Sequence, residues 1–244
     1  MAVAVITGAG SGIGRATAVG FVKAGWEVAL VGRRREPLEE TARLGGGGQP
    51  FPADVTKPDE VERAFAEIAS ALGRIDFLFN NAGRGAPGRP IDEMPLEDWY
   101  GVLDVNLTGA VLCARAAFAQ MRRQSPQGGR IVNNGSISAH APRPGSTAYA
   151  VTKHAITGLT KCLALDGRPF DIACGQIDIG NALTEMAQAM TQGVPQADGS
   201  TRVEDTMEPE HVAQAVLHMA ELPLATNVLF MTIMATKMPF VGRG

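Results

Sequence analysis

The chain has 244 residues, of which 45% are hydrophobic and 19% are charged, and its formal net charge is −3. This size and balance fit one globular α/β domain spanning residues 1–244. With 22 Lys and Arg residues against 25 Asp and Glu residues, the chain lacks the basic surface of a nucleic-acid-binding protein, so we expect no nucleic acid among its partners.

The apolar segments and the cysteines both indicate a cytoplasmic protein. No run approaches the roughly 18 consecutive apolar residues of a membrane span, and the first apolar run stops at Gly8 without a basic region before it. Cys113, Cys162 and Cys174 are far apart and have no CxxC spacing, which is typical of free thiols in a reducing compartment. The four histidines show no metal-ligand spacing, so we expect no metal site. From the lack of a long apolar run we expect no membrane partner.

Short apolar runs alternate with helix-length amphipathic segments, which is typical of repeated β–α units and a parallel sheet. The expected strands are residues 2–7, 27–31, 49–53, 75–80, 129–134, 171–177 and 227–232. The expected helices are residues 12–24, 36–44, 57–72, 96–123, 148–165 and 209–222. Pro50 and Pro52 remove backbone donors from the third strand, so it belongs at a sheet edge. A doubly wound Rossmann-type domain places it there, with seven parallel strands in the order 3-2-1-4-5-6-7 and helices on both faces.

The segment after the sixth strand, at about residues 181–207, is long and rich in Met, Gln and Thr. Gly193 and Gly199 are candidate hinges within it. A stretch of this length without regular structure is usually functional or disordered in a compact domain. Its place in the fold predicts a mobile lid over the substrate, whose pocket is also lined by residues 85–91 and 139–147. Arg143, in the second of these loops, fits a solvated side chain better than a ligand for an acid.

A glycine-rich turn joins the first strand to the first helix. It reads Thr7-Gly8-Ala9-Gly10-Ser11-Gly12-Ile13-Gly14. Glycine lets the backbone turn tightly and lets a pyrophosphate approach the helix N-terminus, where free N–H groups and the helix dipole favour anions. Alone, the motif fits a tight turn as well as a cofactor site, but its strand–turn–helix context favours the cofactor site.

Polar residues follow four other strands at their carboxyl ends. They are Arg33, Asp54, Asn81-Ala82-Gly83 and Ser136, after the second to fifth strands respectively. Open α/β sheets bind ligands at this edge. Structural roles are the alternative: Asp54 could cap the helix that begins near residue 57, and residues 81–83 could form only a turn.

Tyr149 and Lys153 lie one helical turn apart, so both side chains face the same groove. An unperturbed tyrosine titrates near ~10, and positive charge nearby favours its phenolate form. Alone, this pair fits a solvated helix face. With Ser136 and the glycine turn it predicts a proton-transfer group beside a nucleotide site, which is what hydride chemistry at a carbonyl or alcohol requires.

These motifs resemble the short-chain dehydrogenase/reductase family in its compact branch. The resemblance runs from Val3 to about Lys161 and continues more loosely to the seventh strand. It implies a nicotinamide cofactor and a small carbonyl or alcohol substrate. The residues that it implies for cofactor binding are Gly8, Ser11, Gly12, Ile13, Gly14, Arg33, Asp54, Val55, Asn81, Ala82, Gly83, Tyr149, Lys153, Gly180 and Thr184.

The resemblance also implies four catalytic roles. Tyr149 would be the general acid/base and Lys153 the ribose ligand that lowers the tyrosine pKa. Ser136 would orient the carbonyl, and Asn106 would hold a relay water.

Two features depart from the family pattern. Ile179 replaces a proline, which predicts a less rigid start of the lid. The tail at residues 234–240 lacks an Asp-Gly-Gly run, which puts the packing of the tail in doubt.

The end of the second strand predicts NADP(H) rather than NAD(H). NAD-dependent enzymes usually place an Asp or Glu there, which accepts hydrogen bonds from the ribose and repels a 2′-phosphate. This chain has Gly32 at that place and then Arg33, whose guanidinium can hold a phosphate by two charge-assisted hydrogen bonds. The alternative is that Arg33 stacks on adenine without reading the phosphate, which leaves NAD(H) open.

Residues 96–123 and 148–165 carry apolar side chains on more than one face. One face suffices for packing on the sheet, so the surplus predicts burial between subunits, and the resemblance implies a homotetramer.

Two other functions compete with the oxidoreductase. A non-catalytic nicotinamide-nucleotide sensor would lose the proton-transfer residues that this chain keeps. A serine hydrolase would need a G-x-S-x-G motif, which is absent around Ser136.

Overall fold

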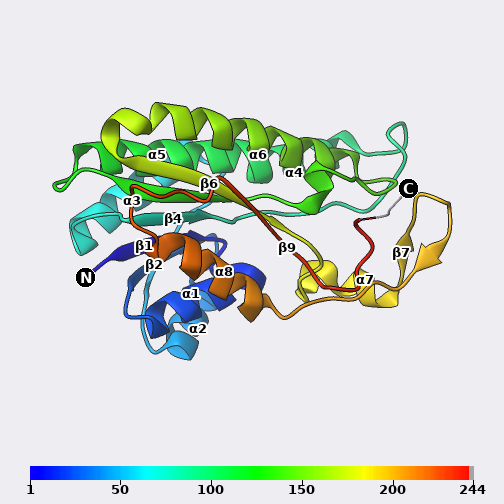
Figure 1. Cartoon of the computed structure of the whole chain (residues 1–244), viewed down its shortest axis with the longest axis horizontal. Helices are drawn as coiled ribbons and strands as arrows, with labels where there is room; N and C mark the ends of the chain where they lie inside the picture. Colours follow the sequence, from blue (N-terminus) through cyan, green and yellow to red (C-terminus); the bar gives the residue numbers. More distant parts are fainter. Residues whose placement is uncertain (242–244) are drawn as a thin grey trace.

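A parallel sheet of seven strands forms the centre of the molecule in the computed structural model, which describes residues 1–241 (Figure 1). In spatial order the strands are β3 (Gln49–Pro52), β2 (Glu27–Gly32), β1 (Val3–Thr7), β4 (Phe77–Asn80), β5 (Gly129–Asn134), β6 (Ile172–Ile179) and β9 (Phe230–Ile233). Each neighbouring pair runs parallel. The predicted order is confirmed, and the strand with two prolines lies at an edge, where missing donors cost least.

Helices cover both faces of this sheet (Figure 1). On one face lie α1 (Gly12–Lys23), α2 (Arg35–Gly45) and α8 (Pro209–Glu221). On the other lie α3 (Pro58–Leu72), α4 (Leu96–Leu103), α5 (Gly109–Arg123) and α6 (Thr147–Asp166). The alternation of strands and helices in the sequence therefore predicts the layers correctly.

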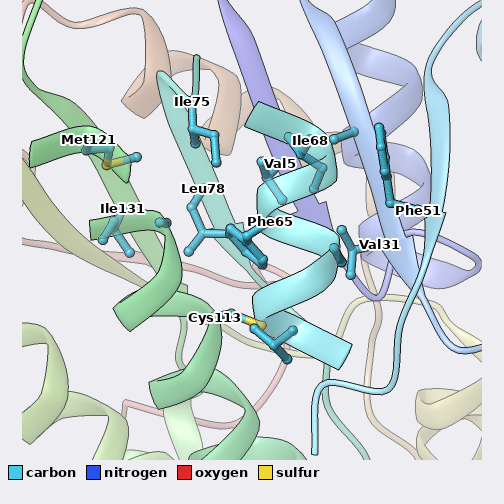
Figure 2. Close-up of a cluster of buried hydrophobic side chains, with 14 of the residues drawn as sticks. Val5, Val31, Phe51, Phe65, Ile68, Ile75, Leu78, Cys113, Met121 and Ile131 are labelled. Atoms are coloured by element: carbon cyan, nitrogen blue, oxygen red, sulfur yellow. The ribbon is translucent and has the colours of Figure 1, made fainter. Parts of the chain in front are cut away.

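Each face of the sheet has its own hydrophobic core, because parallel strands are buried on both sides. Figure 2 shows the core under α3, where Phe65 and Ile68 pack on strand residues that include Leu78. On the opposite face, Phe21 of α1 stacks on Phe77 of β4 with ring centroids 5.1 Å apart. Packing on both faces holds the strands in fixed register, so the loops after them emerge at one edge.

Residues 96–123 form one helical run, as predicted, but a π-helical turn at Asp104–Thr108 separates α4 from α5. Such turns are frequent at functional sites. Within residues 1–241, this run is the one helix long and apolar enough to cross a membrane by length and composition. That property is weak evidence for a span, because a core helix of a soluble protein shares it.

The segment after β6 contains more regular structure than its sequence predicts. It holds a 3₁₀ turn at Glu185–Ala187, the short helix α7 (Gln188–Gln192) and an antiparallel hairpin of β7 (Val194–Pro195) and β8 (Thr201–Arg202). Its two ends meet at residue 207, where the Met207 N–H donates to the Asn181 carbonyl at 2.8 Å. We call residues 181–207 the flap; Figure 1 places α7 and β7 together at one end of the molecule.

The start of the flap and the C-terminal tail are both more ordered than expected. Ile179 extends β6 beyond its predicted end by pairing with Ile233, and the Gly180 N–H donates to the Ile233 carbonyl at 2.7 Å. Strand pairing therefore supplies the rigidity that we expected the missing proline to remove. The tail packs inward, because Met238 is buried and its Sδ lies 3.3 Å from the Asn181 nitrogen, so the doubt about its packing is resolved.

Candidate active site

Three loops are tied together at the carboxyl ends of β1, β4 and β5. Thr7 Oγ1 accepts hydrogen bonds from the backbone N–H groups of Asn81 at 2.9 Å and Ala82 at 3.0 Å. Asn81 Nδ2 donates to the Thr7 carbonyl at 2.9 Å, and Asn81 Oδ1 accepts from Asn134 Nδ2 at 2.8 Å. These bonds fix the loop that contains residues 81–83 at the edge where the sequence predicts a ligand site.

The glycine turn has the geometry of an anion site at the N-terminus of α1. Gly8 and Gly12 have φ values of +68° and +50°, which glycine tolerates best. A Cβ at Gly14 would overlap with the Gly8 carbonyl, so the helix and the turn can touch only through glycine. Within the described residues, the Ser11 side chain accepts no hydrogen bond from the first N–H groups of α1, and the first turn of this helix contains no acidic residue. The first N–H groups of α1 can therefore bind a pyrophosphate.

The flap reaches this turn through Thr184. Its Cγ2 lies 3.1 Å from the position that a Cβ on Gly12 would take. The Ile13 side chain is partly buried and packs against the core on the α1 face. Gly180 packs under the tail, where a Cβ would overlap with Met234. The structure thus brings Thr184 to the glycine turn, whereas Gly180 closes the contact between β6 and the tail.

The end of β2 presents guanidinium groups to solvent. Arg33 and Arg34 are exposed, and neither forms an ion pair within the part of the chain that the structure describes. Arg35, in contrast, lies in α2 and approaches Glu39 to 3.7 Å. Gly32 has no side chain, so the end of β2 lacks the carboxylate that would repel a phosphate bound there. The site can accept an anion without breaking an existing ion pair.

Asp54 and Val55 follow β3 and are held by local contacts. Asp54 Oδ1 accepts from the Thr56 N–H at 3.0 Å and from Thr56 Oγ1 at 2.9 Å, so the side chain closes a turn. The alternative that Asp54 caps α3 is wrong, because the N-cap of that helix is Lys57. Val55 is buried, and a Cβ on Gly109 would lie 2.8 Å from it. Their contact with adenine stays a prediction.

Asn106 lies within the π-helical turn and is buried. Its Oδ1 accepts from the Arg84 N–H at 2.8 Å, and its Nδ2 donates to the Arg84 carbonyl at 3.0 Å. The same Nδ2 lies 3.3 Å from Thr152 Oγ1, one residue before Lys153. The side chain therefore joins the loop after β4 to the helix that carries the tyrosine and lysine.

Ser136, Tyr149 and Lys153 meet between β5 and α6. Ser136 is buried; its Oγ accepts from the Ser138 N–H at 3.1 Å, and its hydroxyl forms a hydrogen bond with Tyr149. Lys153 Nζ donates to the Asn134 carbonyl at 2.7 Å and lies 5.5 Å from the centroid of the Tyr149 ring. The spacing of one helical turn places the partly buried tyrosine and the buried ammonium side by side between β5 and α6.

Burial opposes the charged forms of both Tyr149 and Lys153. It raises the pKa of the Tyr149 hydroxyl above its ordinary value, although the hydrogen bond with Ser136 and the charge of Arg143 act in the opposite direction. It lowers the pKa of Lys153 to about 8, while the Asp178 carboxylate acts to raise it. In the protein alone the pKa of Tyr149 therefore lies above its ordinary value, and positive charge beside the ring would lower it.

Two residues beside this site, Asp178 and His140, escaped the sequence analysis. Asp178 is 1% exposed within β6, and its Oδ2 lies 2.9 Å from His140 Nε2. A signal was present, because a lone carboxylate between Ile177 and Ile179 in a buried strand is rare unless it is paired. The His140 side chain is half exposed, as a surface residue would be, but its ring bonds the buried carboxylate of Asp178.

Arg143 is not simply solvated, so that expectation is wrong. Its guanidinium forms an ion pair with Glu204 of the flap, and it lies 3.3 Å from Asn181 Oδ1. Glu204 also accepts from Asn181 Nδ2 at 2.7 Å and from Gln196 Nε2 at 2.9 Å. The loop after β5 is thus tied to the flap through a largely buried charged network.

Residues 1–241 contain no group of three or more His, Cys, Asp or Glu side chains that could hold a metal ion. Cys113 and Cys174 are buried free thiols, and Cys162 is an exposed one.

Comparison with known proteins identifies the family. A model of the short chain dehydrogenase family matches residues 2–195. Sulfoacetaldehyde reductase 2 of Chromohalobacter salexigens is 33% identical over 240 residues, which cover 96% of this chain and 94% of that protein. The chain belongs to the short chain dehydrogenase family.

Solved structures of similar proteins contain nicotinamide cofactors. The 3-ketoacyl-(acyl-carrier-protein) reductase of Brucella melitensis, complexed with NADH, superposes with a TM-score of 0.85 at 26% identity and covers 96% of this chain and 97% of its own. The closed form of serine dehydrogenase, complexed with NADP⁺, gives a TM-score of 0.84 at 28% identity, with 96% and 94% covered. The chain is thus an NAD(P)-dependent oxidoreductase that acts on CH–OH or C=O groups.

Proposed function

We propose that this chain transfers a hydride between NADP(H) and the carbonyl or alcohol group of a small organic substrate, with Tyr149 as general acid/base. The observation that carries the proposal is the meeting of Ser136, Tyr149 and Lys153 at the carboxyl edge of the sheet, beside the glycine turn. A substrate oxygen placed between the two hydroxyls can receive or release a proton while a hydride moves at the adjacent carbon.

The residues at this edge fit a nicotinamide dinucleotide. Gly8, Gly12 and Gly14 would face its pyrophosphate, where free N–H groups of α1 are available. Arg33 would hold the 2′-phosphate that distinguishes NADP(H), since it is exposed and not paired with an acid among residues 1–241. When bound, the cofactor supplies or accepts the hydride. Residues 81–83, Asp54 and Val55 would contact its nucleoside parts. Ser11 and the backbone of Ile13 would face the pyrophosphate with the rest of the turn, and Gly180 and Thr184 would contact the nicotinamide amide.

Each catalytic side chain then has a defined role. Ser136 orients the substrate oxygen through its hydroxyl. Tyr149 donates a proton to that oxygen during reduction or removes it during oxidation. Lys153 binds the ribose and keeps positive charge near the tyrosine, which favours phenolate. Asn106 holds the loop that contains Arg84 against α6 and would also hold a relay water.

The competing functions fit these residues less well. A protein that only senses nicotinamide nucleotides needs no proton-transfer group. This chain keeps Tyr149 in a hydrogen bond with Ser136, and the buried Lys153 ammonium lies 5.5 Å from the tyrosine ring. A serine hydrolase would need a base on the serine hydroxyl. Here His140 bonds Asp178, and Ser136 Oγ accepts from the Ser138 N–H.

The proposal is tested by a screen of aldehydes, ketones, hydroxy acids and alcohols with NADPH, NADH, NADP⁺ and NAD⁺, followed at the absorbance band of the reduced cofactor. We expect turnover that Tyr149→Phe lowers by several orders of magnitude, because only the hydroxyl is lost, while the affinity for NADP⁺ changes little. Retention of a tenth of the wild-type rate in Tyr149→Phe would contradict the assignment of the tyrosine.

We further propose a cytoplasmic homotetramer in which residues 181–207 close over the substrate. The helical layer formed by α4, α5 and α6 supports the subunit contacts. Its exposed large apolar side chains are Leu96, Tyr100, Val111, Val151 and Leu165. Two adjoining grooves of about 270 and 590 Å³, lined mainly by α5 with α3 and α6, lie on the same layer and away from the catalytic side chains.

A further inference from the structure

Asp178 is a buried carboxylate with three polar partners. It is 1% exposed in β6, and its Oδ1 accepts from the Ser136 N–H at 2.9 Å and from Gln176 Nε2 at 2.7 Å. Its Oδ2 lies 2.9 Å from His140 Nε2. Burying a carboxylate is costly unless such bonds compensate, so its retention in a strand core needs a reason beyond packing.

The Asp178 carboxylate forms hydrogen bonds with the loop after β5 at two positions. One is the backbone of Ser136, where the loop begins, and the other is His140, which follows the 3₁₀ turn at Ile137–Ala139. Gly135 leaves room for this contact, because a Cβ there would overlap with Asp178 Oδ1. The loop that carries the serine hydroxyl is therefore fixed to β6 by one side chain.

The same carboxylate belongs to a polar network that reaches α6. Gln176 donates from Nε2 to Thr157 Oγ1 at 3.1 Å and accepts at Oε1 from Thr160 Oγ1 at 3.0 Å. Thr160 Oγ1 also accepts from Asn133 Nδ2 at 2.9 Å. Asp178 is thus linked both to the serine loop and to the helix that carries Tyr149, and networks of this kind hold groups in one arrangement when fully bonded.

We propose that Asp178 is the positioning residue of Ser136, with His140 as its second anchor on the loop. The inference rests on the proposed function, in which Ser136 and Tyr149 share the substrate oxygen. By holding the Ser136 backbone, the carboxylate keeps the serine hydroxyl against the tyrosine hydroxyl. Asp178 touches no reacting atom itself and acts through the serine.

The ionisation of Tyr149 reports this positioning without a substrate. The hydrogen bond with Ser136 lowers the pKa of Tyr149, so a displaced serine should raise it. The chain has two tyrosines, and the other, Tyr100, is 56% exposed on α4. In a Tyr100→Phe background, a titration of tyrosine absorbance near 295 nm in the complex with saturating NADP⁺ follows Tyr149 alone.

The experiment compares Asp178→Ala with Asp178→Asn in that background. Both variants remove the same charge, but only asparagine keeps an oxygen that can accept from the Ser136 N–H. We expect the Tyr149 midpoint to lie about 1 pH unit higher in the alanine variant than in the asparagine variant, a tenfold change in ionisation constant. Adding Ser136→Ala to both should abolish this difference, because the hydroxyl being positioned is then absent.

A second pair of variants covers the case in which Asp178→Ala does not fold. His140→Phe removes the loop anchor at a half-exposed position beside Phe240, whereas His140→Gln keeps a donor for the carboxylate. We expect His140→Phe to raise the midpoint by about 0.5 pH unit and His140→Gln to leave it close to the parent value.

Equal midpoints within each pair, or a difference that persists without the serine hydroxyl, would overturn the positioning role. Failure of the proposed function looks different: the parent chain would not bind NADP⁺ or NAD⁺, or Tyr149→Phe would retain its turnover. The two failures are therefore distinguishable in the same set of proteins.

Discussion

Single residues at the carboxyl edge of the sheet carry the charges that the proposed reaction uses. Lys153 is 5% exposed, and burial lowers its pKa to about 8 while Asp178 opposes the change. Its ammonium is therefore fully present only below that value and is lost as the pH rises through it. The titratable groups that face it are Tyr149 on the same helix and Asp178 on β6; Arg143 acts on Tyr149, and His140 bonds Asp178.

Cofactor affinity should therefore depend on pH through Lys153. We expect the Kd for NADP⁺ to rise above pH 8, by up to about tenfold per pH unit, because the ribose loses a charged donor. Lys153→Arg should bind more weakly but with a flat profile, since a guanidinium stays charged. Fluorescence or calorimetric titration from pH 7 to 9.5 measures both profiles. An equally steep rise in Lys153→Arg would assign the dependence to another group.

Arg33 should decide the choice between the two cofactors. A bidentate bond to the 2′-phosphate is worth roughly 1.5–3 kcal/mol, so Arg33→Ala should lower the preference for NADPH over NADH by about ten- to a hundredfold. The ratio of kcat/KM values with the two cofactors measures this. Arg35→Ala is the matched control, because that guanidinium already faces Glu39 on α2. An unchanged ratio in Arg33→Ala would make NAD(H) the better assignment.

At the scale of elements, a largely buried charged network ties the flap to the loop after β5. Burial opposes the ionisation of Glu204, but hydrogen bonds from Gln196, Asn181 and Arg143 outweigh it and hold the pKa of the carboxyl below its ordinary value. A carboxyl with a lowered pKa in the folded state stabilises that state above its unfolded pKa, and this stabilisation is lost as the pH falls through the lowered value. The flap should therefore stay attached at mildly acidic pH.

Glu204→Gln should loosen the flap, because it leaves the Arg143 guanidinium without its counter-charge in a partly buried site. We expect thermolysin to cut within residues 181–207 about tenfold faster or more, while the α/β core stays intact. Asp198→Asn is the control, since its ion pair with Arg202 lies on the exposed hairpin and should contribute little. Equal cleavage rates for the two variants would show that the buried pair does not hold the flap.

At the scale of the whole molecule, the helical layer of α4, α5 and α6 has more apolar surface than the sheet can cover. Val111, Val151 and Leu165 remain 39–58% exposed on that layer, although α5 and α6 already bury other residues against the sheet. Exposed apolar side chains on this layer support the proposed subunit contact. The predicted tetramer would bury them.

The assembled mass tests this prediction. We expect light scattering at micromolar concentration to give about four times the chain mass of 25.6 kDa. Val151→Asp should shift the particle towards smaller species, because a charge would then be desolvated in the contact. Lys23→Glu, at the exposed end of α1 on the opposite face, should not. A monomeric mass for the parent chain would contradict the tetramer.

The order of the strands and helices follows from local patterns. Alternation of apolar runs with amphipathic segments needs only neighbouring residues, and Pro50 and Pro52 assign their strand to an edge without knowledge of its partners. Strand ends were less predictable: β6 continues to Ile179 because Ile233 of β9, more than 50 residues away, pairs with it. The structure within the flap was missed because its hairpin and short helix carry weak periodicity.

The sequence by itself determined the class of fold, the glycine turn, and the tyrosine and lysine one helical turn apart, because each depends on spacing within a few residues. The tertiary structure alone decided which distant side chains meet. It joined Asp178 to Ser136 and His140, and Arg143 to Glu204, from separate elements. Such pairs leave little trace in the sequence, since a charged residue is tolerated in a buried strand or loop only where the fold brings it a partner.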